Sequence, residues 1–140
     1  MLKKLKIILV LIVFQFAFVY AQNADDIIGT YHLPNKLDVE IFKVDGNYHG
    51  KIIALNGFRD GQKVDFKNKD KSKRNDSLVG KVIITNLEFD SKKKKWVNGK
   101  MYGPGKGVDF NLKVNEVKEE EIEVVGSKYF FWKTMNWQKI

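Results

Sequence analysis

Residues 95–110 have the sequence KWVNGKMYGPGKGVDF, and this stretch decides the fold that the chain predicts. Its centre is a turn with four residues of special backbone behaviour: Gly103, Pro104, Gly105 and Gly107. Glycine adopts backbone angles that other residues avoid and proline fixes φ, so this density favours a turn. After the turn, apolar and polar side chains alternate over residues 108–114. The stretch therefore predicts a β-hairpin.

The same two-residue period recurs on both sides of this hairpin. Leu37, Val39 and Ile41 alternate with polar residues, and Asp45-Gly46 marks a second tight turn. The further strand-like runs are residues 29–31, 48–55, 78–89, 120–125 and 129–140, and a short helical turn is expected over residues 23–28. About eight strands joined mostly by short turns predict an all-β fold, a single antiparallel barrel. A barrel of this size holds either side chains or one small ligand.

Residues 1–21 have the pattern of a signal peptide. Three lysines precede an apolar run over residues 7–20, and Val19 and Ala21 occupy the −3 and −1 positions of a signal-peptidase site. We expect cleavage after Ala21, export, and one mature domain over residues 22–140. The alternative is an uncleaved membrane anchor, but a spanning helix needs about 20 apolar residues and this run is shorter.

The chain contains no cysteine, and its formal net charge is +8. No disulfide supports the fold, which must therefore depend on packing. The positive charge favours contact with anionic polymers or lipid headgroups without selecting among them.

Residues 56–77 interrupt the alternating pattern. A loop of this length in a compact domain is usually functional or disordered. Its lysines and arginines, together with Phe58 and Phe66, resemble a nucleic-acid surface. Alternating lysine and acid residues are more often a solvated surface, and an exported protein meets little nucleic acid. We therefore expect no nucleic-acid partner, and an anionic envelope component is the remaining candidate for this loop.

Neither a metal site nor a catalytic centre is predicted. His32 and His49, the two histidines, lack the spacing of zinc ligands. The acidic residues of the 56–77 segment lack the central glycine and terminal glutamate of a calcium loop. No Gly-x-Ser-x-Gly motif is present either. We expect a protein that is not an enzyme and that carries no cofactor.

Several short motifs follow one another in a particular order along the chain. They are Gly29-x-Tyr31, Glu40-Ile41, Asp45-Gly46-x-Tyr48-x-Gly50-Lys51-Ile52, Asp65-x-x-Asn68, Arg74, Leu78-x-Gly80, Trp96-x-x-Gly99-x-x-Tyr102-x-Pro104-x-x-Gly107, Val125-Gly126 and Trp137-x-Lys139. In this order the motifs resemble the DUF2147 family of secreted bacterial proteins of unknown function. The resemblance spans nearly all of residues 22–140. It implies a lipocalin-like barrel and a periplasmic or secreted location.

The chain departs from the family pattern at three positions. Tyr31 stands where the family usually has tryptophan, Gly103 replaces the aspartate of a Tyr-Asp-Pro motif, and Lys139 replaces an arginine. In lipocalin-like barrels an aromatic residue near the amino end closes the bottom under a cation from the last strand. The resemblance therefore implies a closing cation–π contact between Tyr31 and Lys139, weaker than one between tryptophan and arginine.

Two functions fit these observations. The first is an exported monomer that binds an apolar or amphipathic small molecule in the barrel mouth, under a lid formed by residues 56–77. Its candidate lining residues are Tyr48, Trp96, Tyr102, Phe110 and Trp132, and its candidate lid residues are Asp65, Asn68 and Arg74. The second is a non-catalytic interaction protein with a filled barrel, whose basic loop and aromatic end contact an anionic envelope partner. The volume of the interior distinguishes the two.

The direction of Trp96 and Tyr102 is a separate question. Strict alternation puts these two residues on one face of the strand and Val97 and Met101 on the other. Simple alternation favours Val97 and Met101 as the inward pair. The resemblance to the DUF2147 family, which repeatedly has tryptophan and tyrosine at this spacing, implies instead that Trp96 and Tyr102 face the interior, because an exposed aromatic pair has no packing reason to be there. We predict this second arrangement.

Overall fold

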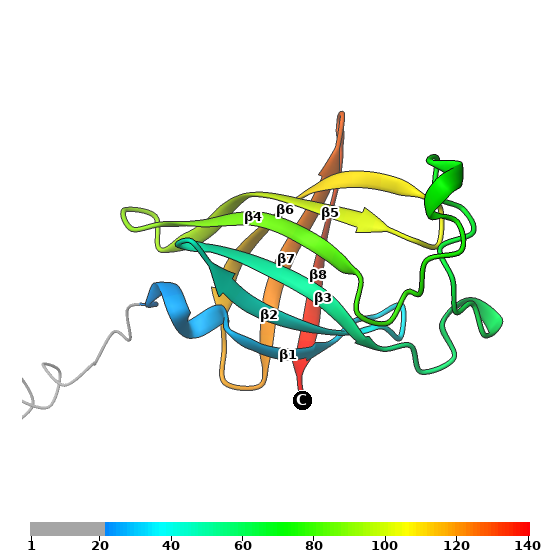
Figure 1. Cartoon of the computed structure of the whole chain (residues 1–140). Helices are drawn as coiled ribbons and strands as arrows, with labels where there is room; N and C mark the ends of the chain where they lie inside the picture. The colour runs from blue at the N-terminus through cyan, green and yellow to red at the C-terminus, as the bar shows by residue number, and fades with distance from the viewer. Residues whose placement is uncertain (1–21) are drawn as a thin grey trace, which may run out of the picture.

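The computed structural model of the chain describes residues 22–140 and shows one closed barrel of eight antiparallel strands (Figure 1). Each strand pairs with its neighbours in sequence, and β8 pairs with β1. The strands are β1 (Gly29–His32), β2 (Asp38–Val44), β3 (Asn47–Ala54), β4 (Val82–Asp90), β5 (Lys95–Gly103), β6 (Val108–Val117), β7 (Glu121–Lys128) and β8 (Phe131–Lys139). The predicted all-β barrel of eight strands is confirmed. The predicted signal peptide, residues 1–21, lies outside the described residues.

Three short 3-10 helices accompany the strands. They are η2 (Ala24–Ile27), η3 (Phe58–Asp60) and η4 (Lys71–Lys73). η2 is the helical turn expected at the amino end, with Asn23 as its cap, and the Asn23 backbone N–H donates to Asp26 Oδ2 at 2.8 Å. Within residues 22–140, no helix has the length and apolar character that a membrane span requires.

The connections divide the barrel into two ends. The closed end carries η2 and the turns at residues 45–46, 91–94 and 118–120. The open end carries the turns at residues 33–37, 104–107 and 129–130 and the long loop, residues 55–81. Figure 1 shows η2, in blue, and the long loop, in green, at opposite ends of the barrel. The turn predicted at Asp45-Gly46 is present, and both residues have positive φ, 51° and 82°.

Three aromatic side chains hold η2 over the closed end. The Tyr31 hydroxyl donates to the Ile27 carbonyl at 2.7 Å, and the Tyr48 hydroxyl donates to Asp25 Oδ1 at 2.6 Å. The indole Nε1 of Trp96 donates to the Ala24 carbonyl at 2.9 Å. Each bond joins a different strand to the helix, so η2 forms a fixed floor beneath the barrel.

Two β-bulges change which side chains face the interior. Asn86 in β4 and Asn98 in β5 have positive φ, 59° and 61°, and the pairing of β5 with β6 shifts between Trp96 and Gly99. Trp96 and Met101 therefore both face inward, whereas Tyr102 faces outward. This corrects the prediction that Trp96 and Tyr102 share the interior, because that prediction assumed unbroken alternation.

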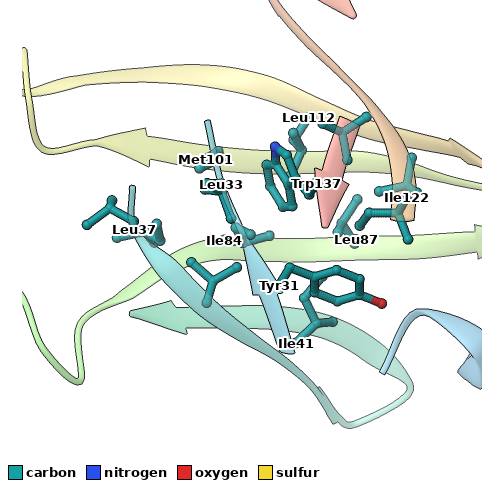
Figure 2. Close-up of a cluster of buried hydrophobic side chains, with 14 of the residues drawn as sticks. Tyr31, Leu33, Leu37, Ile41, Ile84, Leu87, Met101, Leu112, Ile122 and Trp137 are labelled. Carbon is teal, nitrogen blue, oxygen red and sulfur yellow. The ribbon is translucent and has the colours of Figure 1, made fainter. Parts of the chain in front are cut away.

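The interior near the closed end is filled with apolar side chains. Figure 2 shows Tyr31, Ile41, Leu87, Ile122 and Trp137 directed toward one another from five strands. Glycines keep this packing dense. A Cβ on Gly99 would lie 2.6 Å from Leu87 Cδ2, and a Cβ on Gly50 would lie 2.8 Å from Ile84 Cδ1. Buried apolar side chains of the described residues therefore pack this half of the barrel.

The buried tyrosines predict how stability responds to alkaline pH. Burial raises the pKa of Tyr31 to about 12, and it also raises the pKa of Tyr48, to which the hydrogen bond to Asp25 adds. An unfolded tyrosine has a pKa of about 10. The folded pKa is the higher one, so this stabilisation is complete below pH ~10 and is lost as pH rises from ~10 toward ~12.

We expect the free energy of unfolding in urea to fall over this pH range. Tyr31→Phe removes one of the titrating groups, so its stability should depend less on alkaline pH than that of the unmodified protein. The control is Tyr129→Phe, because Tyr129 is exposed. Identical pH profiles for Tyr31→Phe and the unmodified chain would contradict the prediction.

Candidate functional site

The open end of the barrel contains a hollow of about 330 Å³, which we call the mouth hollow. Its lining residues come from the β1–β2 turn and from β5, β6 and β8: Leu33, Pro34, Asn35, Met101, Phe110, Lys133, Met135 and Trp137. This volume lies within the ~300–1,000 Å³ that is usual for small-molecule sites. The wall is mostly apolar, as such sites require.

The short length of β1 creates this hollow. β1 pairs with β8 only at Tyr31↔Lys139 and His32↔Gln138. β8 begins at Phe131, so Lys133 and Met135 lie beyond the last of these pairs and are held only by β7, opposite Gly126 and Val124. The hollow therefore opens sideways, between the β1–β2 turn and the free edge of β8.

Gly126 lets an aromatic ring cross this opening. A Cβ at position 126 would lie 3.1 Å from Phe110 Cε2 and 3.8 Å from Met135 Cε. Phe110 therefore packs directly over the β7 backbone and reaches the side chains of β8. Its place in the hollow depends on this glycine.

Lys133 is the single charged residue in the lining of the mouth hollow. It lies on an exposed part of β8, and none of the ion pairs found within residues 22–140 includes it. Its ammonium group therefore remains hydrated and available at the edge of an apolar space. A ligand with one anionic group suits this arrangement.

A second hollow of about 300 Å³ adjoins the first along the β7–β8 hairpin, and we call it the hairpin groove. It shares Phe110, Lys133 and Met135 with the mouth hollow. Its other lining residues are Gly126, Ser127, Lys128, Phe131 and Trp132. Because three residues line both, the two hollows are adjacent.

A buried carboxylate fixes the long loop to the outside of β5. Asp65 is fully buried, and its Oδ1 accepts the Tyr102 hydroxyl at 2.6 Å. Its Oδ2 accepts the Asn68 amide at 2.7 Å and lies 3.1 Å from Lys81 Nζ. Arg74 Nε donates to the Asn68 carbonyl at 2.8 Å. Burial raises the pKa of Tyr102, and the hydrogen bond to Asp65 adds to this effect.

Further contacts join the loop to the β5–β6 turn. Gln62 Nε2 donates to the Pro104 carbonyl at 3.3 Å, and the Arg59 guanidinium donates to the Gly105 carbonyl at 3.2 Å. Gly107, at φ 67°, packs directly against the Lys67 carbonyl, where any Cβ would collide. The long loop is therefore a docked and ordered part of the fold.

The structure brings the three candidate lid residues together, but away from both hollows. Asp65, Asn68 and Arg74 form one network with Tyr102, and none of them lines the mouth hollow or the hairpin groove. The loop lies against the outer side of β5. Its contacts thus support the rim of the open end, and they do not form the predicted lid.

The five candidate lining residues fall in three separate places. Phe110 lines both hollows, and Trp132 lines only the hairpin groove. Tyr48 and Trp96 lie at the closed end under η2, and Tyr102 lies under the long loop. Lys133, Met135 and Trp137 were missed, although their alternation along the last strand was a usable signal.

The predicted closing pair is adjacent but makes a different contact. Tyr31 and Lys139 are register partners in β1 and β8. The Tyr31 hydroxyl binds the Ile27 carbonyl, and Lys139 is exposed. Tyr31 is absent from the cation–π contacts found within residues 22–140. η2 therefore closes this end, and the cation–π contact implied by the resemblance is not formed.

Metal-ligating side chains are dispersed in the described part of the chain. Within residues 22–140, no group of three or more histidine, cysteine or acidic side chains is placed to hold a metal ion. His32 Nδ1 instead contacts Asp38 Oδ1 at 2.5 Å.

Tyr102→Phe tests the docking network. The change removes one partner of a buried carboxylate and should cost about 1–3 kcal/mol of unfolding free energy in urea. It should also speed proteolytic cleavage within residues 56–77. Tyr129→Phe, which alters an exposed hydroxyl, is the control. Equal stability and equal cleavage rates in the two variants would show that the network does not hold the loop.

Comparison with known proteins agrees with this geometry. The solved structure of protein HP1028 from the human pathogen Helicobacter pylori, described as belonging to the lipocalin family, is similar with a TM-score of 0.71. The similarity covers 81% of this chain and 82% of that chain at 24% sequence identity, so it shows the fold alone. No curated protein matches the chain. The family model described as an uncharacterized protein conserved in bacteria matches residues 29–139, and the chain therefore belongs to the DUF2147 family.

Proposed function

We propose that this protein binds a small amphipathic anion and performs no catalysis. The apolar part of the ligand occupies the mouth hollow, and its anionic group lies at Lys133. The observation that carries this proposal is an apolar space of about 330 Å³ with one unpaired cation at its edge. The lipocalin-like fold supports it, because a barrel of this size can hold one small ligand at its mouth.

The arrangement separates the two parts of such a ligand. Transfer of an alkyl chain from water to the side chains of Met101, Phe110 and Met135 is favourable by about 25 cal/mol per Å² of buried apolar surface. A charged headgroup is costly to bury, but at Lys133 it remains partly hydrated and pairs with an ammonium group. Apolar burial therefore supplies affinity, and the lysine selects the sign of the headgroup.

The shape of the site limits ligand size. The mouth hollow lies at the small end of the range for ligand sites, and its floor is closed by the packed core around Trp137. A longer ligand extends into the hairpin groove, which adds about 300 Å³. A single alkyl chain with one anionic group fits this elongated space better than a rigid polycyclic molecule does.

Lys133→Gln tests the role of the cation. We expect this variant to bind anilinonaphthalene sulfonate, an apolar anionic probe, about five- to tenfold more weakly, because a charge-assisted contact is lost. The control is Lys113→Gln, which removes an equal charge from the exposed outer side of β6. Fluorescence titration gives each dissociation constant, and equal affinities in the two variants would contradict the proposal. Native mass spectrometry of protein from its own host can then identify a retained ligand.

We also propose that the protein is exported to the cell envelope. The basic start, apolar run and Val-x-Ala pattern of residues 1–21 support this location. Amino-terminal sequencing of the protein from its own host should begin at Gln22. A sequence that begins at Met1 would contradict processing and would favour retention of the apolar segment as an anchor.

A further inference from the structure

The tip of the β7–β8 hairpin exposes four consecutive aromatic side chains. Tyr129, Phe130, Phe131 and Trp132 are between 74% and 90% exposed. Scattered apolar side chains are normal on a protein surface, but a contiguous group of large ones marks a contact site. The tip therefore has the character of a docking surface.

This hairpin projects past the rest of the barrel wall, as the orange and red strands in Figure 1 show. The last pair of β6 with β7 is Asn111↔Ser127, and the last pair of β1 with β8 is His32↔Gln138. The Lys128↔Phe131 pair lies beyond both neighbours. The aromatic side chains therefore lie beyond the paired part of the barrel wall, where they can contact a partner.

The charges on the β7–β8 segment that carries the tip, residues 124–140, are of one sign, and Asp109 of β6 is the acidic residue that lines a shared surface hollow with Lys128 and Tyr129. Residues 124–140 contain three lysines and no acidic residue. Lys128 and Lys133 flank the four aromatic residues directly. The rest of the open end carries both signs of charge, with Lys67, Lys69, Lys71, Lys73 and Lys106 beside Asp60, Asp70 and Asp76.

Aromatic side chains surrounded by lysine favour a lipid surface over a protein partner. Tryptophan and tyrosine settle at the level of lipid headgroups, where one end of the ring is apolar and the other is wet. Lysines near them are attracted to anionic headgroups. Protein interfaces are instead depleted in lysine and enriched in arginine. Within residues 124–140 every cationic side chain is a lysine.

We propose that the β7–β8 tip docks on the surface of an anionic lipid bilayer. Phe130 and its aromatic neighbours enter the headgroup region, while Lys128 and Lys133 contact the anionic groups. This inference goes beyond the proposed function, since it requires no ligand in the mouth hollow. Docking in this way turns the hairpin groove toward the lipid, and the groove leads from the tip to the mouth hollow.

The tryptophans provide a direct measurement of docking. Trp96 and Trp137 are buried, whereas Trp132 is exposed. Iodide should therefore quench mainly Trp132 in the free protein. With vesicles of phosphatidylglycerol and phosphatidylethanolamine, we expect a blue shift and loss of iodide quenching. Vesicles of phosphatidylcholine alone should give neither change, and high salt should reverse the binding.

Two pairs of variants locate the contact. Phe130→Ser should weaken vesicle binding about tenfold, whereas Val44→Ser removes a partly exposed apolar side chain at the closed end and should leave binding unchanged. Lys128→Glu should also weaken binding several-fold. Lys92→Glu reverses an equal charge in the closed-end turn and should have a smaller effect. Circular dichroism spectra of all four variants serve as the control for correct folding.

Three results would overturn the proposal. The first is equal vesicle binding by Phe130→Ser and Val44→Ser, and the second is Trp132 fluorescence that anionic vesicles leave unchanged. The third is the absence of vesicle binding together with dimers, detected by sedimentation, that Phe130→Ser dissociates. A second copy of the chain would then be the partner. Probe binding in the mouth hollow is measured without lipid, so its failure and the failure of docking are distinguishable.

Discussion

The fully buried carboxylate of Asp65 is the constraint on which the open end of this barrel depends. A carboxylate shielded from water is tolerated only when hydrogen bonds and opposite charge replace its hydration, and here Tyr102, Asn68 and Lys81 do so. Tyr102 comes from the outer face of β5, whereas Asn68 and Lys81 belong to the long loop. One charged group thus attaches a loop of irregular structure to the barrel wall. With the loop held outside, the mouth hollow keeps an open rim.

The two ends of the barrel are built by different physical means. At the closed end, η2 is held by hydroxyl and indole donors, and side chains fill the space above it. Glycines at positions 50 and 99 permit this density, since a Cβ at either would collide with Ile84 or Leu87. At the open end, β1 is too short to follow β8, so the wall is incomplete there. Packing therefore supplies stability at one end and leaves space for a ligand at the other.

Much of the fold follows from local rules that the sequence displays. Period-2 alternation, the Asp45-Gly46 turn and the Asn23 cap predict the barrel, one hairpin and η2. The bulges at Asn86 and Asn98 were not predicted, and each reverses the inward and outward sets along its strand. Asparagine tolerates positive φ, which is the available signal, but most asparagines in strands do not form bulges. Asp65, Asn68 and Arg74 were predicted as lid residues, and the contacts by which they instead hold the loop against β5 arise from tertiary structure that no spacing reveals.

The sequence was compatible with two alternatives, a barrel filled with side chains and a barrel with an open interior. In the structure the closed end is filled and the open end contains a hollow. In the filled half, Tyr48 and Trp96 bind η2 and line neither the mouth hollow nor the hairpin groove. Beside β8 the wall is incomplete, and Met101, Phe110 and Lys133 line the mouth hollow there. The same strand carries both the lining of that hollow and part of the exposed aromatic tip, because Lys133, Met135 and Trp137 lie along β8 and Phe131 and Trp132 lie at its hairpin end. Lys133 takes part in both proposals, so ligand binding and surface contact share this residue. β8 is longer than its neighbour β1, so the part of β8 that β1 does not pair with borders the mouth hollow and continues into the projecting hairpin. One difference in strand length therefore produces both features.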